Sequence, residues 1–285
     1  MTQEITIQTQ DGIALSATLY LPDKPITGGV VINSATAVKQ TYYQAFATFM
    51  AQQGFAVITY DYRGIGKSAI ANFRDPRLTM HAWGAFDFAA IIDWTQTHYP
   101  ELNWHCIGHS VGGQLVGLAD NNSNLKSVYC IASQSGYWKH WEAFHKPKIF
   151  TLWYAVIPVL SLLLGRVPGR LLGGECLPER IARQWAYWGR NPHYIVDNAG
   201  QPIRDGFERL TCAMKFIQID DDQAFAPPRA VNALASYYRN ASTQIEHIQS
   251  SAQHGGRVGH FGFFRRQHAA SLWPDVVNWL YQHSA

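Results

Sequence analysis

The stretch Gly108–Gly113, with the sequence GHSVGG, joins the apolar run WHCI to a second apolar run, QLVGLA. A short apolar run before a turn is typical of a buried strand, and the run after the glycines has a helical pattern. Gly108 and Gly112 stand two positions before and after Ser110, where a turn this tight admits only small residues. We therefore predict a strand–turn–helix junction that lifts the Ser110 hydroxyl above the edge of a sheet. It also leaves the Val111 N–H at a helix start, where it can donate to an oxyanion.

Short apolar runs alternate with helical patterns on both sides of this stretch. The opening residues, EITIQTQDGIALSATLYLP, alternate polar and apolar side chains around Asp11-Gly12 and predict an antiparallel hairpin. The strands predicted after it are 29–33, 56–60, 104–108, 126–133, 214–219 and 244–249, and the helices are 41–53, 83–98, one from Gly112, 228–239 and 269–283. Apolar strands separated by helices predict an α/β fold, with a mainly parallel central sheet and helices on both faces.

The alternation stops between Tyr137 and Phe207, where helical patterns contain five of the ten tryptophans. We predict no strand in this segment and interpret 137–207 as a helical subdomain, inserted into a core made of 1–136 and 208–285. Within it, Ile149 to Gly165 is a run of 17 residues without a charge, broken by Pro158. A membrane-spanning helix needs about 20 apolar residues, so we expect buried or pocket-lining helices. A surface that dips into one lipid monolayer is the alternative.

Composition narrows the choice of partners and of cellular compartment. The net charge of +3 is spread over 285 residues without a block of like charges, so a nucleic-acid partner is not expected. The four cysteines match no metal-binding spacing and are interpreted as reduced, structural residues. The first residues, MTQEITIQTQDG, show no secretion signal, so a cytoplasmic location is expected. The segment Asp61–Ser68 resembles the end of a phosphate-binding loop but has aspartate where that motif needs glycine, so no nucleotide site is predicted.

A serine hydroxyl attacks a carbonyl only when a base removes its proton, so Ser110 needs a histidine and an acid from later loops. The run MKFIQIDDDQAFAPP ends a predicted strand in three aspartates, of which Asp222 is our choice for the acid and Asp221 the second. A solvated acidic loop is the alternative. In GGRVGHFGFFRR, His260 lies in an apolar loop that suits a base paired with a buried carboxylate. His254 is its nearest competitor, whereas the side chain of His109, beside the serine, should point elsewhere.

With these residues identified, the chain resembles the α/β-hydrolases, and within them the serine aminopeptidase (S33)-like and monoglyceride-lipase-like branch. The resemblance covers most of the chain: TQDGIALSATLYLP, GFAVITYDYRGIGKS, GHSVGG, DDDQAFAPP and GHFGFF occur in the family's order. It implies the α/β-hydrolase fold with an inserted helical lid, with Ser110 as nucleophile, Asp222 as acid and His260 as base. Neither metal nor organic cofactor is implied.

The chain departs from this family after the strand predicted at 29–33. Relatives often carry His-Gly there, whereas this chain has Asn33-Ser34-Ala35-Thr36. The second oxyanion donor in the family is a backbone N–H, so the path of the loop matters more than its side chains. We expect this donor to be the N–H of Ala35, with Thr36 as the alternative.

The inserted segment should influence which substrate binds, because insertions at this point cover the active site in similar folds. Its tryptophans and apolar run favour an apolar acyl or aromatic group, unless they only form the subdomain's own core. Residues 137–207 carry nine lysines and arginines against five acids, which disfavours a substrate with a free ammonium group. The expected function is hydrolysis of a small-molecule carboxylic ester through a Ser110 acyl-enzyme. The alternatives are an aminopeptidase, amidase or acyltransferase that uses the same triad, and a ligand-binding protein without activity.

Overall fold

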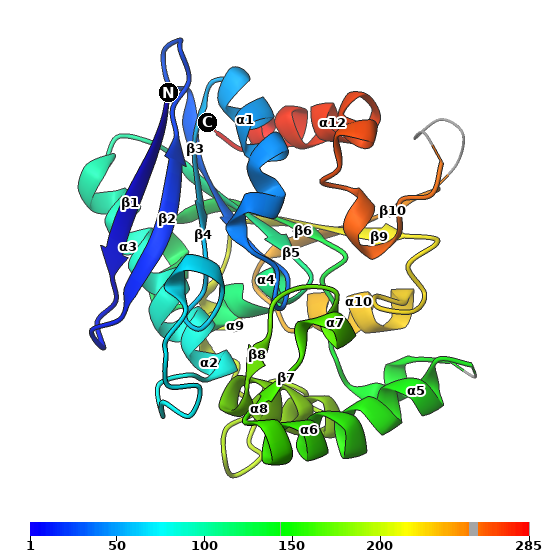
Figure 1. Cartoon of the computed structure of the whole chain (residues 1–285). Helices are drawn as coiled ribbons and strands as arrows, with labels where there is room; N and C mark the ends of the chain where they lie inside the picture. The colour runs from blue at the N-terminus through cyan, green and yellow to red at the C-terminus, as the bar shows by residue number, and fades with distance from the viewer. Residues whose placement is uncertain (143, 251–255, 285) are drawn as a thin grey trace.

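The computed structural model describes residues 1–142, 144–250 and 256–284. Its centre is an eight-stranded sheet with the strand order β1-β2-β4-β3-β5-β6-β9-β10 (Figure 1). The strands are β1 (Thr2–Gln8), β2 (Ala14–Tyr20), β3 (Gly28–Asn33), β4 (Phe55–Tyr60), β5 (Trp104–His109), β6 (Leu125–Ile131), β9 (Ala213–Ile219) and β10 (Ser242–Ile248). Neighbouring strands from β4 to β10 pair in parallel, and the opening hairpin β1–β2 joins β4 antiparallel. The predicted mainly parallel sheet is confirmed.

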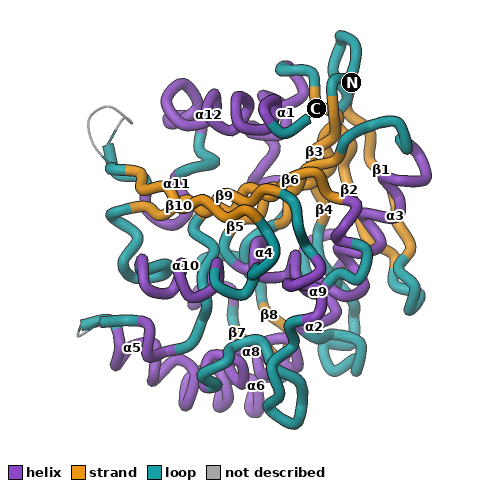
Figure 2. Tube along the Cα trace, turned by 180° about the vertical axis from the view of Figure 1, so that it is seen from behind, coloured by secondary structure: helices purple, strands orange, loops and turns teal. Residues whose placement is uncertain are grey.

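Helices cover both faces of the sheet. The helices of the core are α1 (Gln44–Gln52), α2 (Met80–Ala82), α3 (Ala89–His98), α4 (Val111–Gln114), α10 (Pro228–Ala235), α11 (Gly259–Gly262) and α12 (Ala269–Gln282). Figures 1 and 2 show α1 and α12 side by side on one face, with α10 on the other. A parallel sheet needs such cover because both of its faces are apolar.

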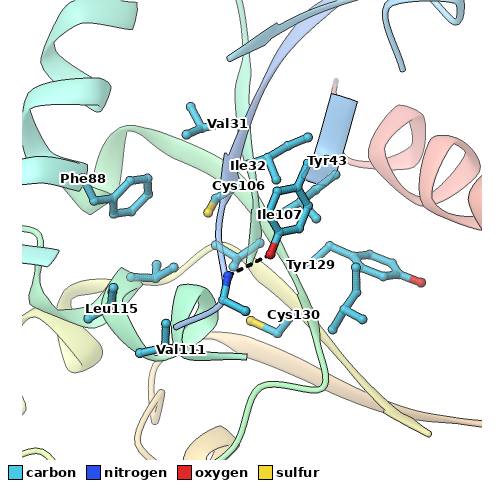
Figure 3. Close-up of a cluster of buried hydrophobic side chains, with 14 of the residues drawn as sticks. Val31, Ile32, Tyr43, Phe88, Cys106, Ile107, Val111, Leu115, Tyr129 and Cys130 are labelled. Atoms are coloured by element: carbon cyan, nitrogen blue, oxygen red, sulfur yellow. Dashed lines mark hydrogen bonds between the residues drawn. The ribbon is translucent and has the colours of Figure 1, made fainter. Parts of the chain in front are cut away.

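The core lies between these layers and explains the unbroken apolar runs of the sequence. Every residue of β3, β4 and β5 is buried, so these strands lack the polar–apolar alternation of a half-exposed sheet. Figure 3 shows Val31, Ile32, Cys106 and Ile107 of the central strands together with Tyr43, which reaches them from outside the sheet. Parallel strands bring their carboxyl ends to one edge, and that is where the loops of the site described below begin.

The segment between β6 and β9 is mainly helical, with α5 (Lys146–Thr151), α6 (Ile157–Leu164), α7 (Gly169–Leu172), α8 (Glu179–Arg190) and α9 (Asp205–Arg209). The expectation that it holds no strand is wrong, because β7 (Arg166–Val167) pairs antiparallel with β8 (Leu177–Pro178). Strands of two residues are too short to show a period-two pattern in the sequence.

The long apolar run meets our expectation of buried or pocket-lining helices only in part. Ile149, Leu152 and Trp153 line the cavity described below, whereas other residues of the run are exposed. Residues Lys146–Leu164 form one 19-residue helical stretch in which α5 and α6 are joined by the π-helical turn η7 (Leu152–Val156). Its length and composition would suit a membrane span, yet only 17% of its most apolar 18 residues are buried inside the protein. One side of the stretch packs inward and the other is left exposed.

Candidate active site

The tight turn predicted around Ser110 is present between β5 and α4. Ser110 has φ 53° and ψ −116°, a strained conformation for a residue with a side chain. A Cβ added to Gly112 would stand 2.2 Å from the carbonyl oxygen of Asn33, and one added to Gly108 would stand 2.5 Å from Cα of Gly113. Neither glycine can carry a side chain, and the turn therefore holds Ser110 at the end of the sheet.

His260 and Asp222 form a close, buried pair. Nδ1 of His260, in α11, lies 2.6 Å from Oδ2 of Asp222, in the loop after β9. The Asp222 side chain is 1% exposed, and its burial raises the pKa of the carboxyl group while the charge and hydrogen bond of His260 lower it. Phe225 stacks on the imidazole with ring centroids 4.9 Å apart and shields this pair on one side.

The three consecutive aspartates have separate hydrogen-bond partners. Asp221 accepts hydrogen bonds from the backbone N–H groups of Val258 (3.1 Å) and Gly259 (2.6 Å). Asp220 accepts from the backbone N–H and the hydroxyl of Ser250. Asp221 thus holds the turn that carries His260, while Asp222 alone of the three contacts its ring. The competing candidate, His254, lies outside the described residues.

Ser110 and His260 line the same cavity, which has a volume of about 110 Å³. Its other walls are apolar or uncharged and come from the core and from the inserted segment: Ala35, Thr36, Gln134, Gly136, Trp141, Ile149, Leu152, Trp153, Leu171, Leu172, Trp185, Tyr194, Phe225 and Phe261. No aspartate or glutamate is among these described lining residues. Within the described part of the chain no hydrogen bond joins the Ser110 hydroxyl to His260, and such bonds often tighten only around a substrate.

Two backbone N–H groups, those of Val111 and Ala35, were predicted to hold an oxyanion. In the structure they differ in whether they already donate a hydrogen bond. The N–H of Val111 is the first of α4 and therefore has no acceptor within the helix. The N–H of Ala35 donates to the hydroxyl of Tyr43 at 2.8 Å, so the expectation for Ala35 needs correction. Thr36, the alternative, lines the cavity, and its backbone N–H has no protein acceptor among the described residues.

The side chain of His109, which we expected to point elsewhere, lies between two loops of the site. Its Nδ1 lies 2.8 Å from the Tyr43 hydroxyl, and its Nε2 lies 2.8 Å from the backbone oxygen of His260. The Tyr43 hydroxyl accepts from Ala35 and therefore donates to Nδ1, which leaves Nε2–H to donate to His260. Burial lowers the pKa of His109 well below its usual range, so the ring is neutral. One imidazole thus ties the loop after β3 to the loop of His260.

No group of three or more histidine, cysteine, aspartate or glutamate side chains is arranged to hold a metal ion within residues 1–142, 144–250 and 256–284. All four cysteines are free thiols. The arrangement instead provides a strained serine, a buried imidazole–carboxylate pair and backbone donors around one apolar cavity. Such a set can carry out acyl transfer through a covalent serine intermediate.

Comparisons with known proteins agree with this chemistry. Residues 24–182 match the family model described as "Serine aminopeptidase, S33". Monoacylglycerol lipase ABHD2 of Danio rerio is 20% identical over 95% of this chain, and the match spans 66% of that relative's length. A thermostable carboxyl esterase from Bacillus coagulans superposes with a TM-score of 0.70 at 14% identity, covering 100% of this chain and 99% of the esterase. The esterase domain of a Rhodothermus marinus protein gives a TM-score of 0.63 at 16% identity, with both chains fully covered.

Proposed function

Because the chain belongs to the serine aminopeptidase S33 family and has the α/β-hydrolase fold, we propose that it is a serine hydrolase that cleaves carboxylic esters. The observation that carries the proposal is the convergence of Ser110, in its strained turn, and the His260–Asp222 pair on one apolar cavity. The family match ends at residue 182, so the assignment of Asp222 and His260 rests on their geometry.

The proposed reaction passes through an acyl-enzyme. Oγ of Ser110 attacks the ester carbonyl carbon while its proton moves to Nε2 of His260. Asp222 accepts the Nδ1–H, which keeps Nε2 free as the base and stabilises the imidazolium that forms. The N–H groups of Val111 and Thr36 hold the oxyanion. The proton then passes to the leaving alkoxide, and a water molecule repeats the sequence to release the acid.

The cavity favours an ester with an uncharged acyl group over an amino-terminal peptide. An aminopeptidase must bind a free ammonium group, which needs a carboxylate or a comparable acceptor beside it. The described cavity lining offers tryptophan, leucine and tyrosine side chains instead. An apolar cavity of about 150 Å³ holds one benzene molecule, so the 110 Å³ observed here suits a short acyl chain or part of one aromatic ring.

Labelling with a fluorophosphonate probe tests the nucleophile directly. We expect the wild-type protein to be labelled and to hydrolyse p-nitrophenyl acetate, and Ser110→Ala to lose both properties while it keeps its melting temperature. Absence of labelling in folded wild-type protein would instead indicate a ligand-binding protein without activity. Faster cleavage of aminoacyl arylamides than of p-nitrophenyl esters would favour the aminopeptidase alternative.

A further inference from the structure

The helical stretch 146–164 presents an apolar surface that no other described element covers. Leu162 and Leu163 are each 71% exposed, and Val159, one turn earlier, is 50% exposed. Figure 1 shows α6 at the outer margin of the molecule, on the far side of the inserted segment from α1 and α12. Contiguous exposed apolar side chains of this size on a soluble domain mark a contact surface.

The opposite side of the same stretch forms part of the active-site wall. Trp153, Ile157 and Ser161 are buried at intervals of four residues, and Leu152 lines the cavity. The indole N–H of Trp153 donates to the backbone oxygen of Gly136 at 2.9 Å. If the stretch left the protein to span a bilayer, the cavity would lose this wall. A partner that binds the outer surface must therefore bind while the stretch remains packed on the protein.

Positive charge lies beside this apolar surface. Residues 138–190 contain eight lysines and arginines against three glutamates, so this segment is net +5 while the rest of the chain is net −2. Beside α6, a hollow is lined by Pro158 and Leu162 together with Arg74, Arg180, Arg183 and Arg190. Glu179 is the one acid that lines this hollow in the described chain, and it pairs with Arg183 at 3.1 Å. The hollow therefore keeps an excess of positive charge next to exposed leucines.

We infer that this surface docks the protein on an anionic lipid bilayer, with the helix lying in the plane of the membrane. Val159, Leu162, Leu163, Arg180 and Arg183 form this docking surface: the apolar side chains enter the boundary between headgroups and acyl chains, and the arginines contact lipid phosphates. Apolar side chains rimmed by basic residues are the combination that such a boundary binds. If the proposed function holds, the cavity behind the same helix would receive its acyl ester from the bilayer.

Vesicle flotation of the full chain tests this docking. The probes are vesicles of phosphatidylcholine alone and of phosphatidylcholine mixed with phosphatidylglycerol, each at low and high salt. We expect binding to the mixed vesicles that weakens with salt. Arg180→Gln/Arg183→Gln should weaken binding to the mixed vesicles by about 30-fold, since each basic residue near an anionic surface contributes about fivefold. Leu162→Ser/Leu163→Ser should weaken binding to both kinds of vesicle by at least about tenfold.

Matched controls lie on the core. Lys24→Gln/Lys126→Gln removes two exposed charges near the amino ends of β3 and β6, and Ile245→Ser removes a 42% exposed side chain of β10. Both controls should bind like wild type. Equal losses in the controls, or no flotation of the wild type with mixed vesicles, would overturn the inference. So would a stable dimer in sedimentation experiments that Leu162→Ser/Leu163→Ser disperses, because the surface would then contact a second copy.

Hydrolysis of p-nitrophenyl acetate, measured in all these variants without lipid, separates the two proposals. We expect it to be unchanged, since none of the substituted residues lines the cavity. A protein that floats with anionic vesicles but cleaves no ester would leave the docking intact and refute the proposed function.

Discussion

Asp222 and Asp221 are adjacent, yet their carboxylates act on different parts of the same loop. Asp222 contacts the imidazole of His260, and Asp221 accepts from the backbone of the turn that precedes it. Losing the first carboxylate disturbs the tautomer and charge of the base, whereas losing the second disturbs the path of the loop.

Asp222→Asn should lower kcat by about 10⁴-fold, the loss typical of a triad that loses its acid while keeping its geometry. KM should change little, because Asp222 does not touch the acyl group. The matched variant Asp221→Asn should cost far less in kcat and should mainly lower the melting temperature. Steady-state kinetics with p-nitrophenyl acetate and thermal denaturation measure both effects, and equal losses of kcat would contradict the separate roles.

His109 connects the loop after β3 to the backbone of His260 and touches no reacting atom. His109→Phe should lower kcat by about tenfold to a hundredfold, because a displaced base loses catalytic alignment. His109→Gln has one acceptor for Tyr43 and one donor for His260, so it should restore most of that loss. A phenylalanine variant as fast as wild type would show that His109 serves only to fill space. A glutamine variant as slow as the phenylalanine variant would contradict the role given to its two hydrogen bonds.

At the scale of elements, the helical stretch 146–164 has two apolar sides with separate tasks. The inner side brings Trp153 into the cavity, where its ring meets Trp185 with centroids 4.7 Å apart. The outer side carries Val159, Leu162 and Leu163. The width of the cavity can therefore be changed without altering the outer surface.

Trp153→Ala should shift the preference from short to longer acyl chains, since it removes the largest side chain of this helix from the cavity wall. We expect the ratio of kcat/KM for p-nitrophenyl octanoate to that for the acetate to rise by at least about tenfold, a range that single-group changes in apolar pockets reach. Trp153→Phe should give an intermediate ratio. Truncating a buried tryptophan costs about 3 kcal/mol or more of stability, so denaturation curves must first show that each variant is folded.

For the molecule as a whole, buried neutral histidines should make stability depend on pH. His105, in β5, is fully buried between the hydroxyls of Ser127 (2.6 Å) and Ser284 (3.1 Å), which joins the sheet to the C-terminal end of the chain. Burial, with smaller contributions from the charges of His283 and Lys126, lowers the pKa of His105 from 6.5 to about 4.

In the unfolded chain this imidazole gains a proton below pH 6.5, whereas in the folded protein it stays neutral until about pH 4. The unfolded state binds more protons in this window, so stability falls as pH falls through it, by up to about 3 kcal/mol for this residue. His105→Gln should flatten this part of the curve of unfolding free energy against pH, measured by urea denaturation. An equally steep fall in the variant would exclude His105 as its source.

Much of this architecture could be predicted from local sequence patterns. The parallel strands and the strand–turn–helix junction at Ser110 depend on side-chain periodicity and on glycines that leave room for the turn. These features are set by residues near one another in the chain, so a short segment of sequence is enough to predict them.

What only the tertiary structure decided depends on residues far apart in sequence. The Tyr43 hydroxyl accepts a hydrogen bond from the N–H of Ala35, and His109 donates one to the backbone of His260. Asp222 contacts the imidazole, while Asp221 holds the adjoining turn. The long apolar run is buried on one side alone, which its composition cannot reveal. Each of these outcomes is a competition for one hydrogen-bond partner or one packing surface, and such a competition is settled only when the chain is folded.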